Sequence, residues 1–395
     1  MDITIKKVSE LIKERIIDEP MDGNHGEKHP KTSDYVQEGV PFILVPDLKD
    51  GKVDLENCNF ITNEMANKLT KGFAKNGDVL LTHKATIGKV AIVDTKKYDY
   101  IILTPQVTYY RVLNNNIIDN KYLYYYFKSN FFQDIFKMYA SSGGTRAYLG
   151  IVAQKKLPIA YPNIDYQRKI VNVLLKYDDL IDNNNKRISI LEQMAEEIYK
   201  EWFVRFRFPG YNNMEFENGI PKGWQIKKVK ECVKRMNFGI TYKAEELEND
   251  GNVIVIDQSK DEFLGFHNNE PSHKANLDNP VLLFGDHSCK TKIMIKDFSL
   301  GENVIPYISN NNNKINNYYL YYATNKLIET EEYKRHWSRF CGFKIFIPPI
   351  EIQNDYMKYI KVLEQEKELL WQKNQNLIKQ RELLLPRLMS GKLEV

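Results

Sequence analysis

Three polar segments in the first 150 residues have side chains that could contact phosphate or base edges: residues 25–32, 82–89 and 141–146. Lysine, arginine, hydroxyl groups and free backbone amides contact phosphate, and arginine, lysine, asparagine and glutamine suit base edges. Considered alone, each segment is more often an ordinary solvated loop. The side chains that we predict at a nucleic-acid surface are His25, Lys28, His29, Lys31, His83, Lys84, Thr86, Lys89, Thr145 and Arg146.

Part of the segment 82–89 is expected to be structural. Gly88 suits a turn, and Ile87 is apolar enough to enter a core. Lys84 and Lys89 are therefore the favoured contacts in this segment.

The second half of the chain also places polar segments after apolar runs. Residues 257–260 follow the run 253–256, and residues 285–290 follow the run 281–284, at the place that matches 82–89. Residues 334–339 match the region of 145–146 and combine basic side chains with an aromatic one. The candidate contacts here are Gln258, Lys260, His287, Lys290, Lys334, Arg335 and Arg339.

Sequence motifs for catalysis are missing. There is no Gly-x-x-x-x-Gly-Lys-Ser/Thr loop for ATP and no Gly-x-Gly-x-x-Gly for a nucleotide or S-adenosylmethionine. Ile347 precedes Pro348-Pro349, where an amino-methylase motif needs asparagine to orient the target amine. Asp47 and Glu56 are not followed by the Glu-x-Lys of a nuclease. We therefore expect no catalytic residue and no cofactor in this chain.

Composition restricts the protein class further. His25 and His29 have no cysteine or carboxylate partner at ligand spacing, so a metal site is not expected. The four cysteines are scattered, which fits a reduced cytoplasm. The net charge of +4 makes any nucleic-acid surface a local patch. Because no apolar run or signal segment is present, we expect a cytoplasmic protein without membrane contact.

Two long amphipathic segments must position these polar loops. Each begins with Pro-x4-Gln, and the two glutamines, Gln167 and Gln353, are 186 residues apart (353 − 167). After each glutamine, apolar residues recur at steps of four and three with the same offset, which predicts helices that supercoil about each other. The residues expected in the coiled-coil or subunit interface are Leu174, Ile181, Asn184, Ile188, Leu191, Trp202, Leu363, Leu370, Asn374, Leu377 and Leu384.

Polar residues interrupt the second apolar stripe at Lys367, Asn374 and Arg381. A polar residue in such a seam fixes the register of two helices and lowers their stability. The alternative is that the two helices are separate and that each packs on its own module.

The chain therefore divides into four segments. We expect a module at 1–164, a long helix at 165–208 that Pro209 and Gly210 end, a second module at 209–350 and a second long helix at 351–395. The tyrosine-rich stretches 122–126 and 318–322 could stack on bases, but packing of an amphipathic helix on a core is favoured. The expected fold is α+β: two α/β modules joined by two long antiparallel helices that form a coiled coil, with a pseudo-twofold internal repeat.

Two modules, each followed by a copy of one long helix, resemble the specificity subunit of type I restriction-modification enzymes over essentially the whole chain. The supporting motifs are the two Pro-x4-Gln entries, Ile181-Asp182-Asn183-Asn184-Asn185, Trp202-Phe203-Val204, Pro221-x-Gly-Trp224 and the final Leu388-Met389-Ser390-Gly391-Lys392-Leu393. The first module departs from the pattern because it starts at the equivalent of Gln225. The second module is shorter before Gln353, which predicts a reduced final loop or helix.

The resemblance implies that each module is a target recognition domain for one half of a bipartite double-stranded DNA site. It also implies that the helices separate the two domains and dock two methyltransferase subunits, with restriction subunits added in the full nuclease. Adenine-N6 methylation and ATP-dependent cleavage would then belong to the partners, which would bind S-adenosylmethionine, ATP and Mg. This chain would be a non-catalytic subunit.

Two other functions compete with this interpretation. A coiled-coil scaffold with two protein-binding modules would leave the basic loops unexplained. A stand-alone nuclease is opposed by the missing motifs. The sequence does not specify a DNA target.

Overall fold

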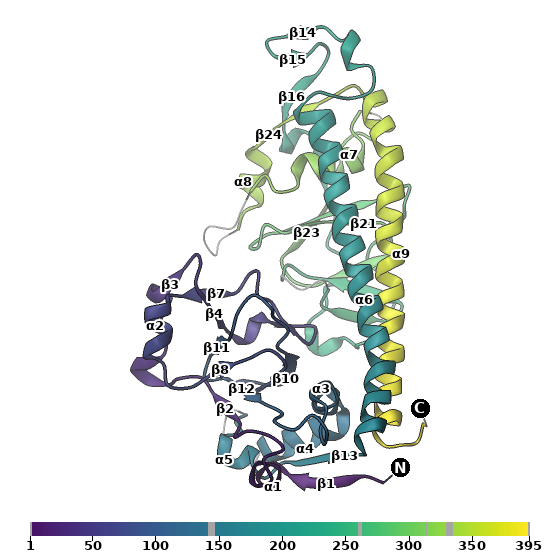
Figure 1. Cartoon of the computed structure of the whole chain (residues 1–395). Helices are drawn as coiled ribbons and strands as arrows, with labels where there is room; N and C mark the ends of the chain where they lie inside the picture. The colour runs from purple at the N-terminus through teal and green to yellow at the C-terminus, as the bar shows by residue number, and fades with distance from the viewer. Residues whose placement is uncertain (1, 141–146, 260–262, 313, 329–334, 394–395) are drawn as a thin grey trace. The chain divides into compact units, whose positions relative to one another are not determined.

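The computed structural model describes residues 2–140, 147–259, 263–312, 314–328 and 335–393. The chain forms two compact units, one from Met1–Ile181 with Gln375–Val395 and the other from Asp182–Asn374. We call these unit 1 and unit 2 (Figure 1). Each unit contains one module and a stretch of each long helix, so the boundaries of the compact units fall within the helices.

In the part that the structure describes, unit 1 contains three sheets and five short α-helices beside its stretches of the two long helices. Its strand orders are β2-β12-β9-β10-β6-β5, β3-β7-β4-β11-β8 and β1-β13. The strands are β1 (Thr4–Lys7), β2 (Met21–Asp22), β3 (Tyr35–Val36), β4 (Val40–Ile43), β5 (Leu48–Lys49), β6 (Lys52–Val53), β7 (Asn59–Ile61), β8 (Phe73–Ala74), β9 (Val79–Lys84), β10 (Thr86–Ile92), β11 (Ile101–Leu103), β12 (Val107–Tyr110) and β13 (Pro158–Tyr161). The helices are α1 (Val8–Lys13), α2 (Asn63–Lys68), α3 (Asn120–Lys128), α4 (Asn130–Ala140) and α5 (Ile151–Gln154).

Unit 2 has shorter sheets, with strand orders β17-β23-β20-β21, β19-β18-β22, β16-β24 and β14-β15. The strands are β14 (Phe216–Glu217), β15 (Ile220–Pro221), β16 (Gln225–Lys228), β17 (Val233–Arg235), β18 (Val253–Ile256), β19 (Gly265–His267), β20 (Val281–Gly285), β21 (Thr291–Met294), β22 (Phe298–Leu300), β23 (Val304–Ser309) and β24 (Lys344–Ile347). The helices are α7 (Asn317–Thr324) and α8 (Trp337–Gly342). The apolar runs 253–256 and 281–284 form β18 and most of β20.

The two units share one plan of strand pairing. The order β2-β12-β9-β10 in unit 1 corresponds to β17-β23-β20-β21 in unit 2. In unit 1, β4 pairs antiparallel with β7 and parallel with β11, and in unit 2 β18 pairs in the same ways with β19 and β22. The internal repeat predicted from the helices therefore extends through the sheets of both modules.

The two-stranded sheet β1-β13 of unit 1 corresponds to the sheet β16-β24 of unit 2. Thr4 on β1 pairs with Tyr161 on β13, and Gln225 on β16 pairs with Ile347 on β24. Because Tyr161 and Ile347 keep the 186-residue offset, Thr4 occupies the position of Gln225. Thr4 and Gln225 therefore begin equivalent strands in the two modules.

The predicted reduction of the second module is also confirmed within the described residues. Unit 2 has the six-residue helix α8 before β24. At the corresponding place, before β13, unit 1 has α4 with 11 residues and α5 with four.

The two long helices are α6 (Ile164–Tyr199) and α9 (Ile350–Met389). Within unit 2 they lie side by side and antiparallel (Figure 1): Asn184 bonds Asn374, Arg187 bonds Glu366, and the Trp202 ring lies 5.9 Å from that of Tyr356. Asn374 lies between the two helices as a polar seam residue, as expected. Its side chain also donates to Asn185 Oδ1 at 2.7 Å. Pairing of the helices is thus confirmed in this unit.

The apolar residues predicted in the helix interface differ in how deeply they are buried. Leu174, Trp202 and Leu370 are buried, Leu363 and Leu384 are partly buried against the cores, and Ile181, Ile188, Leu191 and Leu377 are half-buried. In unit 1, Leu174 of α6 shares a core with Leu385 and Leu388 of α9.

The first long helix ends earlier than expected. After Tyr199 it continues as a π-helical turn at Lys200–Val204 and stops there, before the predicted end at 208. Phe206 adopts a positive φ of 57°, which an L-residue in a helix cannot have. The rings of Phe203, Phe206 and Phe208 instead gather around Trp224 at 6.0, 5.2 and 5.7 Å, so core packing ends the helix.

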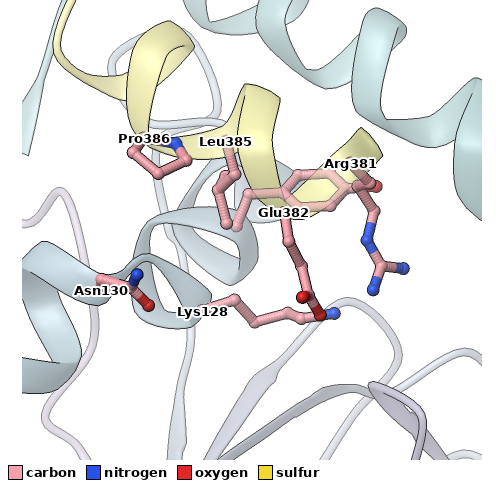
Figure 2. A pocket seen from close by; sticks show the side chains of 7 residues that line it. Lys128, Asn130, Arg381, Glu382, Leu385 and Pro386 are labelled. Carbon is pink, nitrogen blue, oxygen red and sulfur yellow. The ribbon is translucent and has the colours of Figure 1, made fainter. Parts of the chain in front are cut away.

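A polar contact joins the helix pair to the module inside unit 1. Arg381 of α9 pairs with Asp178 of α6, and the Tyr125 hydroxyl of α3 donates to the same carboxylate. Beside them lies a cavity of about 160 Å³, lined by Tyr125, Lys128, Asn130, Arg381, Glu382, Leu385 and Pro386. Figure 2 shows Lys128 extending toward the part of α9 that contains Arg381 and Glu382.

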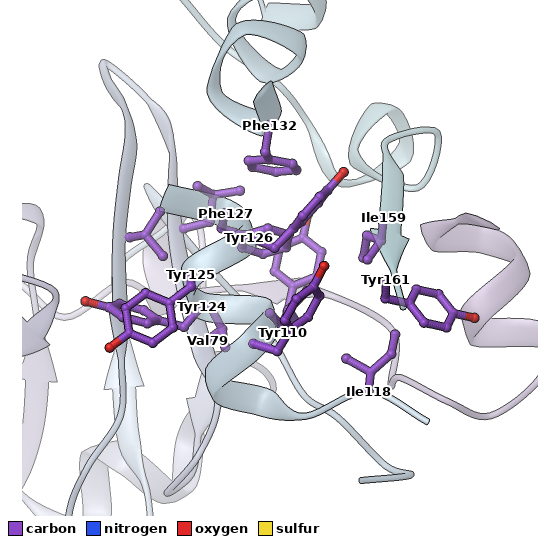
Figure 3. Close-up of a cluster of buried hydrophobic side chains, with 14 of the residues drawn as sticks. Val79, Tyr110, Ile118, Tyr124, Tyr125, Tyr126, Phe127, Phe132, Ile159 and Tyr161 are labelled. Atoms are coloured by element: carbon purple, nitrogen blue, oxygen red, sulfur yellow. The ribbon is translucent and has the colours of Figure 1, made fainter. Parts of the chain in front are cut away.

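The tyrosine-rich stretches form α3 and α7, and their rings are core residues. Tyr122 is buried in this core, and Figure 3 shows Tyr124, Tyr125 and Tyr126 with Phe127, Phe132 and Ile159. In unit 2, Tyr318, Tyr319 and Tyr322 are buried in the same way. Core packing, the favoured interpretation of these stretches, is therefore confirmed.

Candidate nucleic-acid interface

The β9–β10 hairpin presents three of the exposed predicted contacts in unit 1. Lys84 pairs with Thr86 across a tip where Ala85 has a φ of 66°, and the side chains of Lys84, Thr86 and Lys89 are exposed. Gly88, with a φ of 87°, lies in a bulge of this hairpin, as its predicted turn role requires. Ile87 packs against the core as expected.

His83 is the clear departure in this hairpin, because the structure buries it completely. Side chains alternate faces along a strand, so the exposure of Lys84 directs His83 inward. The His83 ring lies under the exposed Tyr148 ring at 5.8 Å. A direct DNA contact from this side chain therefore does not fit the structure.

The predicted segment 25–32 is divided between surface and core. Lys28 and Lys31 are exposed, and His25 is exposed while its Nε2 bonds the Asp22 carboxylate at 2.8 Å. His29 is half-buried, and its ring meets Phe42 edge-on at 5.5 Å. Burial lowers the pKa of His29, so this side chain is a neutral packing residue at neutral pH.

Sequence reasoning missed Asp22 and Lys71. The Lys71 ammonium pairs with the carboxylate of the buried Asp22, which also holds His25. The fold thereby adds a cation to this surface that lay outside all three polar segments. A single lysine in Thr70-Lys71-Gly72 gives no sequence signal for such a role.

The candidates of unit 2 gather at the ends of β18 and β20. The Gln258 Oε1 accepts from the backbone N–H of His287 at 3.0 Å, and Lys290 Nζ donates to the Ser259 carbonyl at 3.0 Å. Gln258, His287 and Lys290 are all half-buried. Internal hydrogen bonds therefore fix the connection that follows β20.

A second group of unit 2 candidates lies beside this connection. Asp286 accepts from the backbone N–H groups of His336 and Trp337, and the exposed Arg335 lies 3.8 Å from the same carboxylate. Arg339 is exposed one helical turn further, on α8. The structure therefore brings four candidates to one region of unit 2, where residues 286 and 287 connect them. The four are Gln258, His287, Lys290 and Arg335.

Four predicted contacts, Thr145, Arg146, Lys260 and Lys334, lie outside the described residues. Within the described ranges, no group of three or more His, Cys, Asp and Glu side chains has the arrangement of a metal site. No helix in that part of the chain is long and apolar enough to span a bilayer.

Comparison with known proteins agrees with the family resemblance that the repeated modules and helices indicated. The model of the type I restriction modification DNA specificity domain matches residues 14–193. The MjaIX type I restriction enzyme specificity subunit of Methanocaldococcus jannaschii is 32% identical over 212 residues, covering 52% of this chain and 47% of that protein. A second chain of that organism, described as the MjaX specificity subunit, is 23% identical over 381 residues, covering 90% and 88%.

A solved structure agrees with the fold. The S subunit of the type I restriction-modification system from M. genitalium matches with a TM-score of 0.52 at 16% identity, covering 98% of this chain and 96% of that one. This chain spans about half the length of the MjaIX relative and most of the MjaX relative. The family model, the relatives and the shared fold agree, and the chain is similar to the specificity subunits of type I restriction-modification systems.

Proposed function

We propose that this chain gives a type I restriction-modification complex its DNA sequence specificity, with each unit reading one half of a bipartite double-stranded site. The observation that supports this most strongly is the repeated strand plan with different polar side chains at matching positions. The tip of the β9–β10 hairpin presents Lys84 and Thr86, whereas the connection between β20 and β21 contains His287 and Lys290. Two similar frames with different side chains suit two different half-sites.

The partners belong to the same proposal. Both long helices expose large apolar side chains, which commonly mark protein interaction surfaces. Those on the helices are Leu180, Ile190, Met194, Tyr359, Val362, Leu369 and Leu383. We assign these faces to two methyltransferase subunits and, in the nuclease, to restriction subunits. This chain itself would be non-catalytic, and S-adenosylmethionine, ATP and Mg would bind the partners.

A map of N6-methyladenine in the source genome, with and without this gene, tests the proposal. Loss of one split motif on deletion is the expected result, and it would identify both half-sites. If every methylated motif persists after deletion while the partner methyltransferase is expressed, the specificity role is contradicted. The protein-binding scaffold would then become the better account.

A further inference from the structure

Asp22 joins side chains from three separate segments of unit 1. Its Oδ2 bonds His25 Nε2 at 2.8 Å, its Oδ1 pairs with the Lys71 ammonium, and the His83 Nε2 lies 4.0 Å from Oδ2. The side chains of Asp22 and His83 are 7% and 1% exposed, whereas those of Lys71 and His25 are 33% and 50% exposed. The group thus has a buried acid and a buried imidazole below two partly exposed donors.

The backbone around this group is tightly constrained. The Asn24 side chain donates to the Lys71 carbonyl at 2.6 Å and accepts from the Thr70 N–H at 3.1 Å. A Cβ on Gly72, whose φ is +83°, would lie 2.8 Å from the Gly23 Cα, so only glycine permits this approach of the two segments. The contacts of Asn24 and the close approach of Gly23 and Gly72 therefore fix the backbone next to Lys71 and His25.

The hydrogen bonds of His83 determine which ring nitrogen carries the proton. Nδ1 lies 3.1 Å from the Leu149 carbonyl oxygen, which can only accept, so Nδ1 must donate. In the neutral ring, Nε2 then has only a lone pair. Among the residues that the structure describes, this buried atom has no hydrogen-bond partner, and it faces another acceptor, the Asp22 carboxylate.

Burial and the neighbouring polar groups act on this imidazole in opposite directions. Burial lowers the pKa of His83, and the charge of Asp22 and the carbonyls of Leu149 and Pro105 oppose that effect. Burial also disfavours the charged form of Asp22, but its hydrogen bonds to Lys71 and His25 hold the pKa of this carboxyl below its usual range. The described groups that act on His83 are thus Asp22, His25, Lys71 through Asp22, and the neighbouring Tyr148 ring.

Resting on the proposed role in DNA reading, we propose that Lys71 and His25 bind a DNA phosphate and that His83 takes up a proton when they do so. A phosphate competes with Asp22 for both donors. The buried carboxylate then loses its compensating charges, which is unfavourable. A proton on His83 Nε2 would replace them with an ion pair across the present 4.0 Å gap.

The sign of the pH effect follows from this linkage. Because the DNA-bound state would hold more protons than the free state, affinity would rise as pH falls, by up to about tenfold per pH unit for one proton. His25 is the second imidazole that contacts Asp22. The two contributions must therefore be separated by variants.

The test uses the complete complex of this chain with its methyltransferase subunits. The probe is a duplex that contains the split motif from the methylation map, and a scrambled duplex is the reference. The Kd is measured from pH 6 to pH 8 at constant ionic strength, with proton uptake measured by calorimetry in buffers of different ionisation enthalpy. H83N keeps a donor for the Leu149 carbonyl but cannot titrate, and H25Q keeps a donor for Asp22 but cannot titrate.

We expect tighter binding at low pH for the wild type and for H25Q, and loss of the His83 contribution in H83N. D22N should lose the same contribution, because the new amide can donate to His83 Nε2, and it keeps the test valid if H83N misfolds. Specific binding with no pH dependence in the wild type, or with the full dependence in H83N, would overturn this inference alone. Absence of specific binding at every pH would contradict the proposed function as well.

Discussion

Gln167 in unit 1 and Gln353 in unit 2 make the same three hydrogen bonds. Each Oε1 accepts from the backbone N–H of the residue that caps the tyrosine helix, and each Nε2 donates to two carbonyls. The partners are Asp119, Ile117 and Pro162 in unit 1 and Asn316, Lys314 and Pro348 in unit 2, at 2.7 to 3.0 Å. The Pro-x4-Gln motif therefore attaches each long helix to its own module.

Replacing either glutamine with alanine should destabilise the unit that contains it. Both side chains are fully buried, so truncation leaves backbone donors and acceptors unpaired at a cost of about 2 to 4 kcal/mol. Chemical denaturation followed by circular dichroism measures this. The exposed neighbour variant R168A is the control and should change stability by less than about 0.5 kcal/mol. Equal effects from Q167A and R168A would contradict the attachment role.

The Asp178–Arg381 pair should contribute more to stability than an exposed pair on the same helices. Its side chains are 19% and 15% exposed, and the Tyr125 hydroxyl also bonds the carboxylate. R381A leaves that carboxylate half-buried without its cation and should destabilise unit 1 by about 3 kcal/mol.

The matched control for this pair is R187A. Arg187 and Glu366 are 52% and 39% exposed, so their separation should change the free energy of unfolding by less than about 1 kcal/mol. A loss in R381A no larger than that in R187A would show that helix pairing does not depend on the Asp178 contact.

Lys128 should make the stability of unit 1 depend on alkaline pH. Burial, with Arg381 nearby, lowers the pKa of Lys128 to about 8, whereas an unfolded lysine titrates near 10.5. Between these values the unfolded chain binds the extra proton, so this group makes stability rise with pH across about 8 to 10. The difference in unfolding free energy between wild type and K128M should shrink or change sign over this range. A difference that is constant with pH would refute the prediction.

Charge reversal at the β9–β10 tip should weaken DNA binding, because it removes part of the salt-dependent electrostatic attraction to phosphate. K84E should lower affinity by about tenfold and reduce the slope of log K against log salt concentration by about one, as expected for one lost phosphate contact. K121E, on the exposed start of α3, adds the same charge change away from the tip. Binding of both variants by the assembled complex is measured by titration at several salt concentrations. A slope unchanged in K84E, or changed equally in K121E, would remove the tip from the interface.

The repeated helices and their pairing could be predicted from the sequence, because the spacing of apolar residues can be recognised without tertiary information. The 186-residue offset, the antiparallel pairing in unit 2 and the core role of the tyrosines all follow from repeated spacing. The end of α6 could not be predicted, because ring packing around Trp224 stops the helix before Pro209.

The candidate surface was less predictable, since it depends on strand faces and on contacts between distant segments. His83 looked exposed beside Lys84, yet the strand directs these neighbours to opposite faces. Asp22 and Lys71 are 49 residues apart and meet only because the backbone at Gly23 and Gly72 can approach closely. No local motif encodes such a meeting.

Replacing one module tests whether each unit reads its own half-site. The segment 209–350 is exchanged for the corresponding segment of another specificity subunit, and N6-methyladenine is mapped in cells that express the hybrid with its methyltransferase. We expect a split motif in which one half changes and the other half stays as in the wild type. A motif that changes in both halves, or in neither, would contradict this expectation.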